Sequence, residues 1–411
     1  MEDKKVKNVI IIAMLITILL LGLTEIASTQ ENIIKIGASV SLTGKTAYEG
    51  RRIKQGYEVW EDWVNSHGGI TAGGINYKVK MVYYDDESSP TTSAKLTEKL
   101  ITVNKVDFLF GPYSSAITFA TTAIGEKYKI ISIAPQANAI KIYERGYKYV
   151  FAVLPPAPMI MVPTVYMAVN LDPKPKTIAI ILENDLFPIS CAEGLVDACK
   201  DLGIEIVLYE KYPVGSTDIS APLTKAKDLN PDILGIACNI EGIILFMRQC
   251  KELNINPKMY AISMGITTPA FIEELGVDAD YVFEAEWWLP NMMTSDKVFG
   301  TTADFIQACK DKFGPDYIPE QRTASGACAG TLLQLAIEKA DSIETEKVRE
   351  ALLTLDLELA TSPRIKFNEK GQNISWLHPV IQVQDGKFVT VYPESSQENA
   401  PIYPTPEWKK R

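Results

Sequence analysis

The sequence is poor in the side chains on which most catalytic and metal sites depend. Only 2 of its 411 residues are histidine, His67 in a glycine turn and His378 before a proline. The 6 cysteines include no Cys-x-x-Cys pair and have no histidine beside them, so a zinc site is not expected. No Gly-x-Gly-x-x-Gly or Walker motif follows a predicted strand, which removes the usual fingerprints of hydride transfer and nucleotide hydrolysis. We therefore expect no enzyme activity, no metal and no cofactor.

The cysteines themselves are expected to be buried thiols. Cys191 and Cys199 lie eight residues apart on one predicted helix, which separates them by about 12 Å. A disulfide needs Cα atoms within roughly 7 Å, so these two cannot pair with each other. Disulfides between other members stay open, but small buried thiols are the commoner use of cysteine in a long chain. The remaining members are Cys238, Cys250, Cys309 and Cys328.

Positive charge is also in short supply. The chain has 41 lysines and arginines against 51 aspartates and glutamates, a net charge of −10. This is the wrong sign for a surface that neutralises phosphates, so nucleic acid is not an expected partner. With 46% hydrophobic and 22% charged residues, the chain is neither disordered nor a disulfide-knotted miniprotein. Its length suits two globular lobes.

The amino terminus has the pattern of an export signal. Lys4, Lys5 and Lys7 precede the apolar run 9–23, a basic region followed by a hydrophobic one. At 1.5 Å per residue this run covers about 22 Å, less than the ~30 Å hydrocarbon core of a bilayer. Residues 1–30 are therefore predicted to be a signal peptide, with a retained N-terminal anchor as the alternative because the cleavage site at 26–29 is a poor match. We expect the protein to be exported to the periplasm or outer cell surface.

The rest of the chain alternates short apolar runs with amphipathic stretches, the pattern of α/β structure. This rhythm is interrupted by the proline-rich stretch 154–158 and then restarts, which predicts two Rossmann-like lobes with parallel central sheets. After residue 285 we expect helices at 295–313, 323–340 and 345–353, and then short antiparallel strands. A proline-rich tail, 393–411, is expected to be extended. Predicted strands are 33–40, 77–84, 106–110, 130–134, 177–182, 204–209, 233–237, 259–262, 364–367, 380–384 and 388–392.

Polar loops of small residues follow three of the predicted strands, at 41–44, 111–115 and 134–138. In open parallel sheets ligands bind at the carboxyl ends of strands, where backbone N–H groups and helix N-termini converge. Ser114 and Ser115 stand where a helix begins. They are interpreted either as helix caps or as part of a cradle for a carboxylate.

Several landmarks in this order resemble one known family. They are Ile34-Lys35-Ile36-Gly37, Ser41-Leu42-Thr43-Gly44, Gly50, His67-Gly68-Gly69-Ile70, Asp85-Asp86, Gly111-Pro112-Tyr113-Ser114-Ser115, Ala134-Pro135-Gln136-Ala137-Asn138, the stretch 178–237 and the run 364–371. Over about 33–392 the chain resembles the leucine/isoleucine/valine-binding protein family, the type I periplasmic solute-binding proteins of branched-chain amino acid ABC transporters.

The resemblance implies a fold and a partner. It implies two α/β lobes joined by a multi-strand hinge, with a cleft that closes around its cargo. Lobe 1 would hold 33–154 plus about 290–360, and lobe 2 would hold 155–288 plus about 361–392. The partners would be a small amino acid or carboxylate and the permease subunits of an ABC transporter, with contact to the membrane only through the N-terminal segment or the permease.

The resemblance also implies site residues. Ser115, next to Ser114, and Asn138 would contact the ligand's carboxylate and amine, while Gln136 and Ala137 would offer backbone groups. Tyr48 would line the pocket for the ligand's side chain. Phe187 and Asn239 would contact the ligand from the second lobe. Possible lining residues are Asp185, Trp287 and Trp288.

Met264 is the main departure from the family pattern. If the alignment has no local gap, Met264 stands where amino-acid binders place a carboxylate against the ligand's ammonium group. An unpaired ammonium in a closed cleft costs several kcal/mol. Either another carboxylate substitutes for it (Glu183, Asp185, Glu241 or Glu286), or the cargo is an amine-free apolar or aromatic acid. A ligand-sensing module of the same fold is a further alternative to a transport function.

Overall fold

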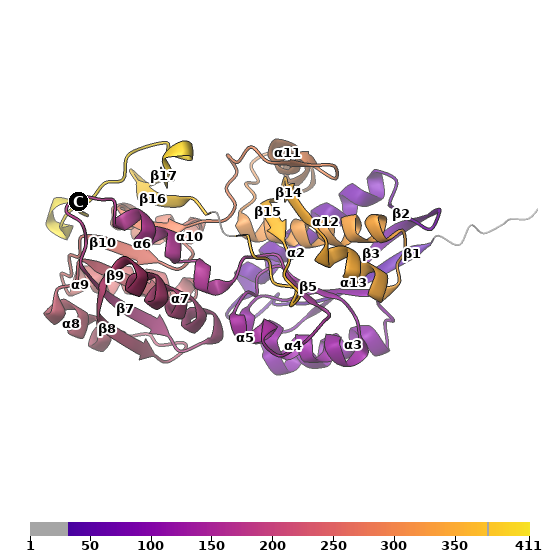
Figure 1. The fold of residues 1–411 in the computed structure, drawn as a ribbon, viewed down its shortest axis with the longest axis horizontal. Coiled ribbons are helices and arrows are strands. Elements are labelled where there is room, and N and C mark those ends of the chain that lie inside the picture. The colour runs from indigo at the N-terminus through magenta and orange to yellow at the C-terminus, as the bar shows by residue number, and fades with distance from the viewer. Residues whose placement is uncertain (1–31, 376–377) are drawn as a thin grey trace, which may run out of the picture.

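The computed structural model describes residues 32–375 and 378–411, apart from the side chain of Glu241. The predicted export signal lies outside these residues. Figure 1 shows two α/β lobes side by side, as the alternating sequence pattern predicted. Among the described residues, no helix is both long and apolar enough to cross a membrane.

Lobe 1 is built on a sheet that has six strands in the described part of the chain, in the order β2-β3-β1-β4-β5-β6. The central strand β1 (Ile33–Val40) pairs in parallel with its neighbours on both sides and is almost wholly buried after its first residue, as expected of a strand covered on both faces by helices. The other early elements are α2 (Ala47–Ser66), β2 (Ile70–Ala72), β3 (Ile75–Asp85), α3 (Pro90–Thr102), β4 (Phe108–Phe110), α4 (Ser115–Tyr128), β5 (Ser132–Ala134), α5 (Ile140–Tyr143) and β6 (Val150–Ala152).

Later segments return to lobe 1. Helix α12 crosses α2 at very close range, because Gly326 of α12 lies against the backbone of Ile53 in α2. The hairpin of β14 and β15 also packs into the core of this lobe. These segments are β12 (Ser295–Asp296), β13 (Gly300–Thr301), α11 (Thr302–Phe313), α12 (Gln321–Ala340), α13 (Thr345–Leu353), β14 (Asp356–Leu359) and β15 (Ser362–Lys366).

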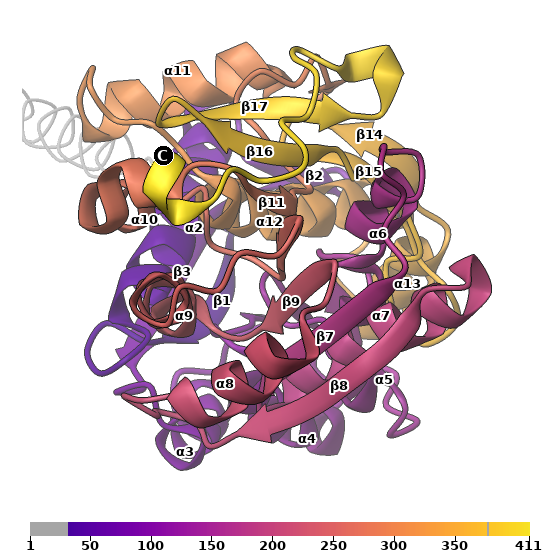
Figure 2. The same ribbon diagram turned by 90° about the vertical axis from the view of Figure 1, so that its left-hand side faces the viewer.

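Lobe 2 has a sheet of seven strands within the described chain, in the order β17-β16-β11-β10-β9-β7-β8. Strands β7 to β11 run parallel, and β16 and β17 add an antiparallel edge. Figure 2 views the molecule from this lobe. Its elements are α6 (Val162–Ala168), β7 (Thr177–Glu183), α7 (Leu186–Leu202), β8 (Glu205–Tyr212), α8 (Ser220–Leu229), β9 (Ile233–Ala237), α9 (Ile240–Glu252), β10 (Met259–Ile262), α10 (Pro269–Leu275), β11 (Val282–Ala285), β16 (Val380–Gln384) and β17 (Lys387–Tyr392), with short 3₁₀ helices Ala157–Met159, Gly276–Ala279, Glu394–Ser396 and Trp408–Lys410.

Three expectations need correction. Residues 295–301 form the short β12–β13 hairpin, and the helix begins only at Thr302, where Thr301 and Asp304 form a capping box. The segment 362–367 belongs to the core of lobe 1, not lobe 2, because Ile365 and Phe367 pack there. The tail is not simply extended: the indole of Trp408 is buried in lobe 2 and donates to the carbonyl of Ile255 at 2.7 Å.

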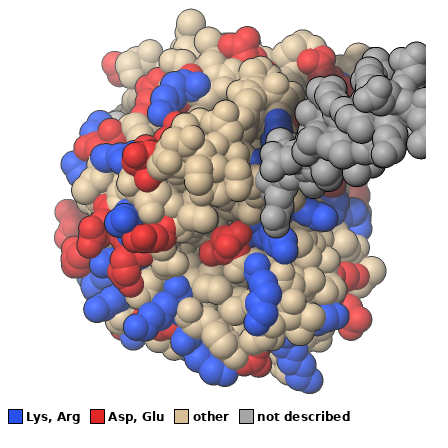
Figure 3. All heavy atoms as spheres, turned by 90° about the vertical axis from the view of Figure 1, so that its right-hand side faces the viewer, with Lys and Arg blue, Asp and Glu red and all other residues tan. Residues whose placement is uncertain are grey.

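The cysteine expectation agrees with the structure. All six cysteines lie in the described part of the chain, and there each is buried and none is in a disulfide bond, as predicted. On the face shown in Figure 3, acidic and basic side chains are interspersed.

The chain passes between the lobes between β6 and α6, between β11 and α11, and between β15 and β16. The lobes also touch away from these crossings, where the backbone N–H of Ile140 donates to the hydroxyl of Ser190 at 3.2 Å. Loops that follow the parallel strands of both lobes line one cavity at this seam, among them Gln136 after β5 and Asn239 after β9.

Candidate functional site

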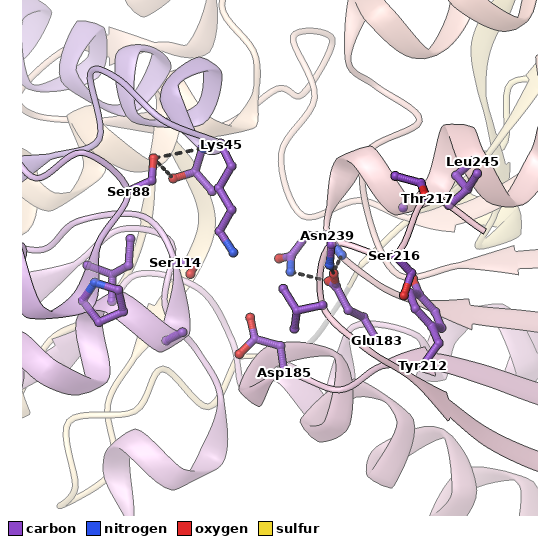
Figure 4. A pocket seen from close by; sticks show the side chains of 17 residues that line it. Lys45, Ser88, Ser114, Glu183, Asp185, Tyr212, Ser216, Thr217, Asn239 and Leu245 are labelled. Atoms are coloured by element: carbon purple, nitrogen blue, oxygen red, sulfur yellow. Dashed lines mark hydrogen bonds between the residues drawn. The ribbon is translucent and has the colours of Figure 1, made fainter. Parts of the chain in front are cut away.

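A cleft lies between the two lobes at the carboxyl ends of their strands. Its outer part has a volume of about 420 Å³. Lobe 1 contributes Lys45 and Ser114, and lobe 2 contributes Glu183, Asp185 and Asn239; in Figure 4 these side chains face one another across the gap. A cavity of this size suits a small organic molecule.

The inner part of the cleft is almost filled by protein. Its volume is only about 10 Å³, room for about one water molecule. A ligand of amino-acid size therefore needs the lobes to separate before it can enter. The walls are Tyr113, Ser114, Ser115, Gln136, Asn138, Leu154, Phe187, Asn239 and Met264.

The two serines of lobe 1 do not act as ordinary helix caps. Ser114 occupies the N-cap position of α4, but its side chain makes no capping hydrogen bond. The hydroxyl of Ser115 accepts a hydrogen bond from the backbone N–H of Ala139 at 3.2 Å. A hydroxyl that accepts in this way still has its own hydrogen to donate. Both serines are thus placed to meet a carboxylate at the first turn of α4.

The loop after β5 is held by its own side chains. The amide of Asn138 donates to the carbonyl of Pro155 at 2.6 Å, at the first crossing between the lobes. The amide of Gln136 donates to the side chains of Gln321 and Ser325 at 2.6 and 2.8 Å. The carbonyl of Ala137 accepts from the hydroxyl of Tyr143 at 2.7 Å. This network fixes where the polar groups of lobe 1 face the cleft.

Glu183, at the end of β7 in lobe 2, lies across the cleft from lobe 1 (Figure 4). Its carboxylate accepts from the side-chain amide of Asn239 at 2.6 Å and from the backbone N–H groups of Asn239 and Gly215 at 3.3 and 3.4 Å. Asp185 caps α7, where one of its oxygens accepts from the N–H of Leu186. Of the carboxylates considered as substitutes at the Met264 position, these two line the cleft, and the side chain of Glu241 lies outside the described part of the structure.

Glu286, the remaining substitute, is buried behind the cleft. Its carboxylate accepts from the hydroxyl of Thr267 at 3.0 Å and from the N–H of Trp287 at 2.9 Å. Burial raises the pKa of Glu286 to about 7. Burial, and then the nearby charge of Glu286, raises the pKa of Glu284 well above its ordinary value.

The structure brings together most of the residues that the sequence singled out. Ser114, Ser115, Gln136, Asn138, Phe187, Asn239 and Met264 line the inner cleft, and Asp185 lines the outer part. The side chains of three others line neither part of the cleft. The hydroxyl of Tyr48 donates to Glu320 at 3.2 Å, Trp287 lines a separate cavity of about 410 Å³, and Trp288 packs on Phe305 in the core of lobe 1.

Sequence reasoning did not find several residues of the cleft. Lys45 directly follows the polar loop 41–44, and that position was a signal that could have identified it. Ser216 and Thr217 sit in a loop after β8, and the sequence has no motif that marks this loop as part of a site. In Figure 4 the amine of Lys45 points from lobe 1 into the gap, toward the wall that carries Glu183.

Comparison with known proteins gives a consistent result. A family model described as periplasmic binding protein matches residues 33–387. The Leu/Ile/Val-binding protein homolog 8 of Brucella abortus is 28% identical over 377 residues, covering 88% of this chain and 91% of that protein.

Solved structures share the fold. A leucine-binding protein from Thermotoga maritima has a TM-score of 0.76 at 23% identity and covers 87% of this chain and 97% of its own. A solute-binding protein of an ABC transporter from R. palustris, in complex with benzoate, has a TM-score of 0.74 at 19% identity, with 88% and 96% covered. A branched-chain amino acid binding protein from Streptococcus pneumoniae, in complex with isoleucine, has a TM-score of 0.72 at 21% identity, with 87% and 98% covered.

Proposed function

Because the chain belongs to the periplasmic binding protein family, and so is a binding protein and not an enzyme, we propose that it captures a small carboxylate between its lobes for an ABC importer. The observation that carries this proposal is a single site built from both lobes, in which hydroxyl groups and a helix N-terminus of lobe 1 face Phe187, Asn239 and Met264 of lobe 2. A ligand that touches both walls favours the closed arrangement, since only there does it gain all its contacts. The permease and an extracytoplasmic location are part of the same proposal.

The class of ligand follows from the chemistry of the site. Leucine, benzoate and isoleucine are the ligands named for three solved proteins of this fold, and all carry a carboxylate beside an apolar body. In this chain Ser114 and Ser115 at the first turn of α4 would take the carboxylate. Phe187 and Met264 would pack the body of the ligand.

A ligand amine would meet two carboxylates of the cleft wall, Glu183 and Asp185. Glu183 is held by Asn239 and Gly215 and, with Asp185, lies beside the inner cavity. The alternative proposal is an amine-free acid, favoured by Met264, which cannot pair with an ammonium group. Titration calorimetry of the purified protein with L-leucine, L-isoleucine, L-asparagine, L-glutamine and benzoate distinguishes these cases. Heat from amino acids alone supports the Glu183 role, heat from benzoate alone supports the alternative, and no heat from any of them contradicts the proposed function.

Ser115→Ala is expected to weaken the affinity for a carboxylate ligand by about tenfold to a hundredfold, because a hydrogen bond to a charged group contributes roughly 1.5–3 kcal/mol. Calorimetry with the best ligand of the panel measures this change. Ser93→Ala is the matched control, since Ser93 is a buried serine of lobe 1 whose hydroxyl bonds to Ser39. Unchanged affinity in Ser115→Ala, with lowered stability, would leave Ser115 only the role of holding Ala139.

A further inference from the structure

Arg322 is a buried arginine whose guanidinium lacks hydrogen-bond partners. It lies in the first turn of α12, and its side chain is fully buried. Among the described residues, none of its three side-chain nitrogens makes a hydrogen bond. The nearest carboxylate is Glu320, whose oxygen lies 3.6 Å from one nitrogen, too far for a good hydrogen bond. An arginine offers five N–H donors, and leaving them unpaired inside a protein is costly.

Unpaired acceptors gather around the same place. One carboxylate oxygen each of Glu49 and Glu320, and the amide oxygen of Gln136, are buried and make no hydrogen bond within the described structure. The Glu320 oxygen does lie in an ion pair, 3.5 Å from Nε of Arg52. The charges that act on Arg322 include those of Glu320, Glu49 and Glu286. The cluster therefore holds unused donors and unused acceptors together. Such a cluster needs a guest that can both accept and donate hydrogen bonds.

This cluster is continuous with the inner cleft. Gln136 lines the inner cavity and donates to Gln321, the residue next to Arg322. Tyr113 lines the same cavity and interacts electrostatically with Arg322. The cluster thus lies beside the inner cavity, which Gln136 and Tyr113 border. A ligand held by its carboxylate at Ser115 would direct its other end toward this region.

We propose that Arg322, Glu49, Glu320 and Gln136 form a recognition site for the far end of the cargo, and that this end is a neutral polar group, of which a carboxamide is the simplest. The inference rests on the proposed function and names the ligand class. A hydrocarbon end would leave all these groups unpaired. A second anionic end would meet Glu49, Glu320 and Glu286. A carboxamide donates to the carboxylates and accepts from the guanidinium.

The test compares ligands of equal shape. L-Asparagine and L-leucine have the same branched outline, and L-glutamine and L-methionine have similar length. Calorimetry with the purified protein is expected to show at least tenfold tighter binding of the polar member in one of these pairs. Arg322→Met is expected to lower the affinity for that polar ligand at least thirtyfold, while the affinity for its apolar counterpart is unchanged or higher.

Arg322→Lys checks the result without removing the charge, because lysine keeps the charge but loses the planar fork of donors. This variant is expected to lower the affinity for the polar ligand and to leave the affinity for the apolar one unchanged. Thermal unfolding of the ligand-free variants checks that they fold. Tighter binding of the apolar member in both pairs, or an equal loss for both members in Arg322→Met, would overturn the inference and leave the proposed function intact. No heat from any acid would overturn both the inference and the proposed function. Equal affinity within both pairs, as expected if water alone fills the cluster, would overturn the inference only.

Discussion

Replacing Gly326 by alanine is expected to lower the free energy of unfolding by about 3 kcal/mol, the upper end of the usual range for overpacking a tight core. A Cβ atom at this position would lie 2.3 Å from the carbonyl oxygen of Ile53 and 3.2 Å from the Cα of Gly56. These are backbone atoms, so no rotation of a side chain relieves the clash, and α2 and α12 must move apart. The contact joins an early and a late segment of the chain, so its loss opens the core of lobe 1. Urea unfolding followed by circular dichroism measures the change.

Gly235→Ala is the matched control for this prediction. Gly235 is also buried, in β9, but a Cβ atom there would meet its nearest neighbours at 3.5–3.7 Å, which is ordinary contact. Its expected effect on the unfolding free energy is less than about 1 kcal/mol. If both variants unfold at the same urea concentration as the parent, the prediction that α2 and α12 cross too closely for a Cβ atom at position 326 is wrong.

Glu286→Gln is expected to stabilise the protein at pH 8 and to have little effect at pH 5. Burial raises the pKa of Glu286 from 4.5 to about 7, so between these values the folded form holds a proton that the unfolded form has lost. Unfolding then releases a proton, and the stability of the parent falls as the pH rises through this window. The difference amounts to about 3 kcal/mol, since each pKa unit corresponds to about 1.4 kcal/mol. Glutamine carries no proton to lose.

The comparison between variant and parent removes other titrations from this result. Burial lowers the pKa of His378 to about 4, which acts on stability in the opposite direction but equally in both proteins. The charged groups that act on Glu286 are Arg322, Glu320 and Glu284, and all remain in the variant. Loss of the Glu286 charge also lowers the raised pKa of Glu284, which adds to the expected stability gain at high pH in the same direction. Glu344→Gln, at a side chain that is 68% exposed, serves as control. A stability gap of equal size at pH 5 and pH 8 would contradict the assignment.

The sequence predicted the regular parts of the fold because their signals are local. Strands 233–237 and 259–262 were predicted with the bounds that the structure has, since each is a short apolar run between turn residues. The stretch 295–313 was predicted as one helix because its apolar spacing continues before the helix, although Thr301 caps it at 302. The placement of 362–367 in lobe 1 depends on which lobe a hairpin packs against, and no local pattern carries that information.

Local sequence signals predicted some residues of the site and not others. Ser115, Gln136 and Asn138 were found because they follow strands, and parallel sheets bring such loops together. Arg322 stands in a helix that packs on α2. Its position near Glu49 arises from the crossing of segments that are 273 residues apart in the chain. The sequence shows it only as an ordinary arginine among the polar residues before a helix.

The central claim, that a small acid draws the two lobes together, is tested most directly by the distance between them. Lys95 in α3 and Lys211 in β8 are both exposed, one on each lobe, and cysteines introduced there would be labelled selectively because the native cysteines are buried. Energy transfer between a fluorophore pair at Lys95→Cys and Lys211→Cys is expected to rise, to a saturating value, on addition of those acids of the calorimetry panel that release heat. Unchanged energy transfer at a concentration where calorimetry shows the site to be full would contradict the account.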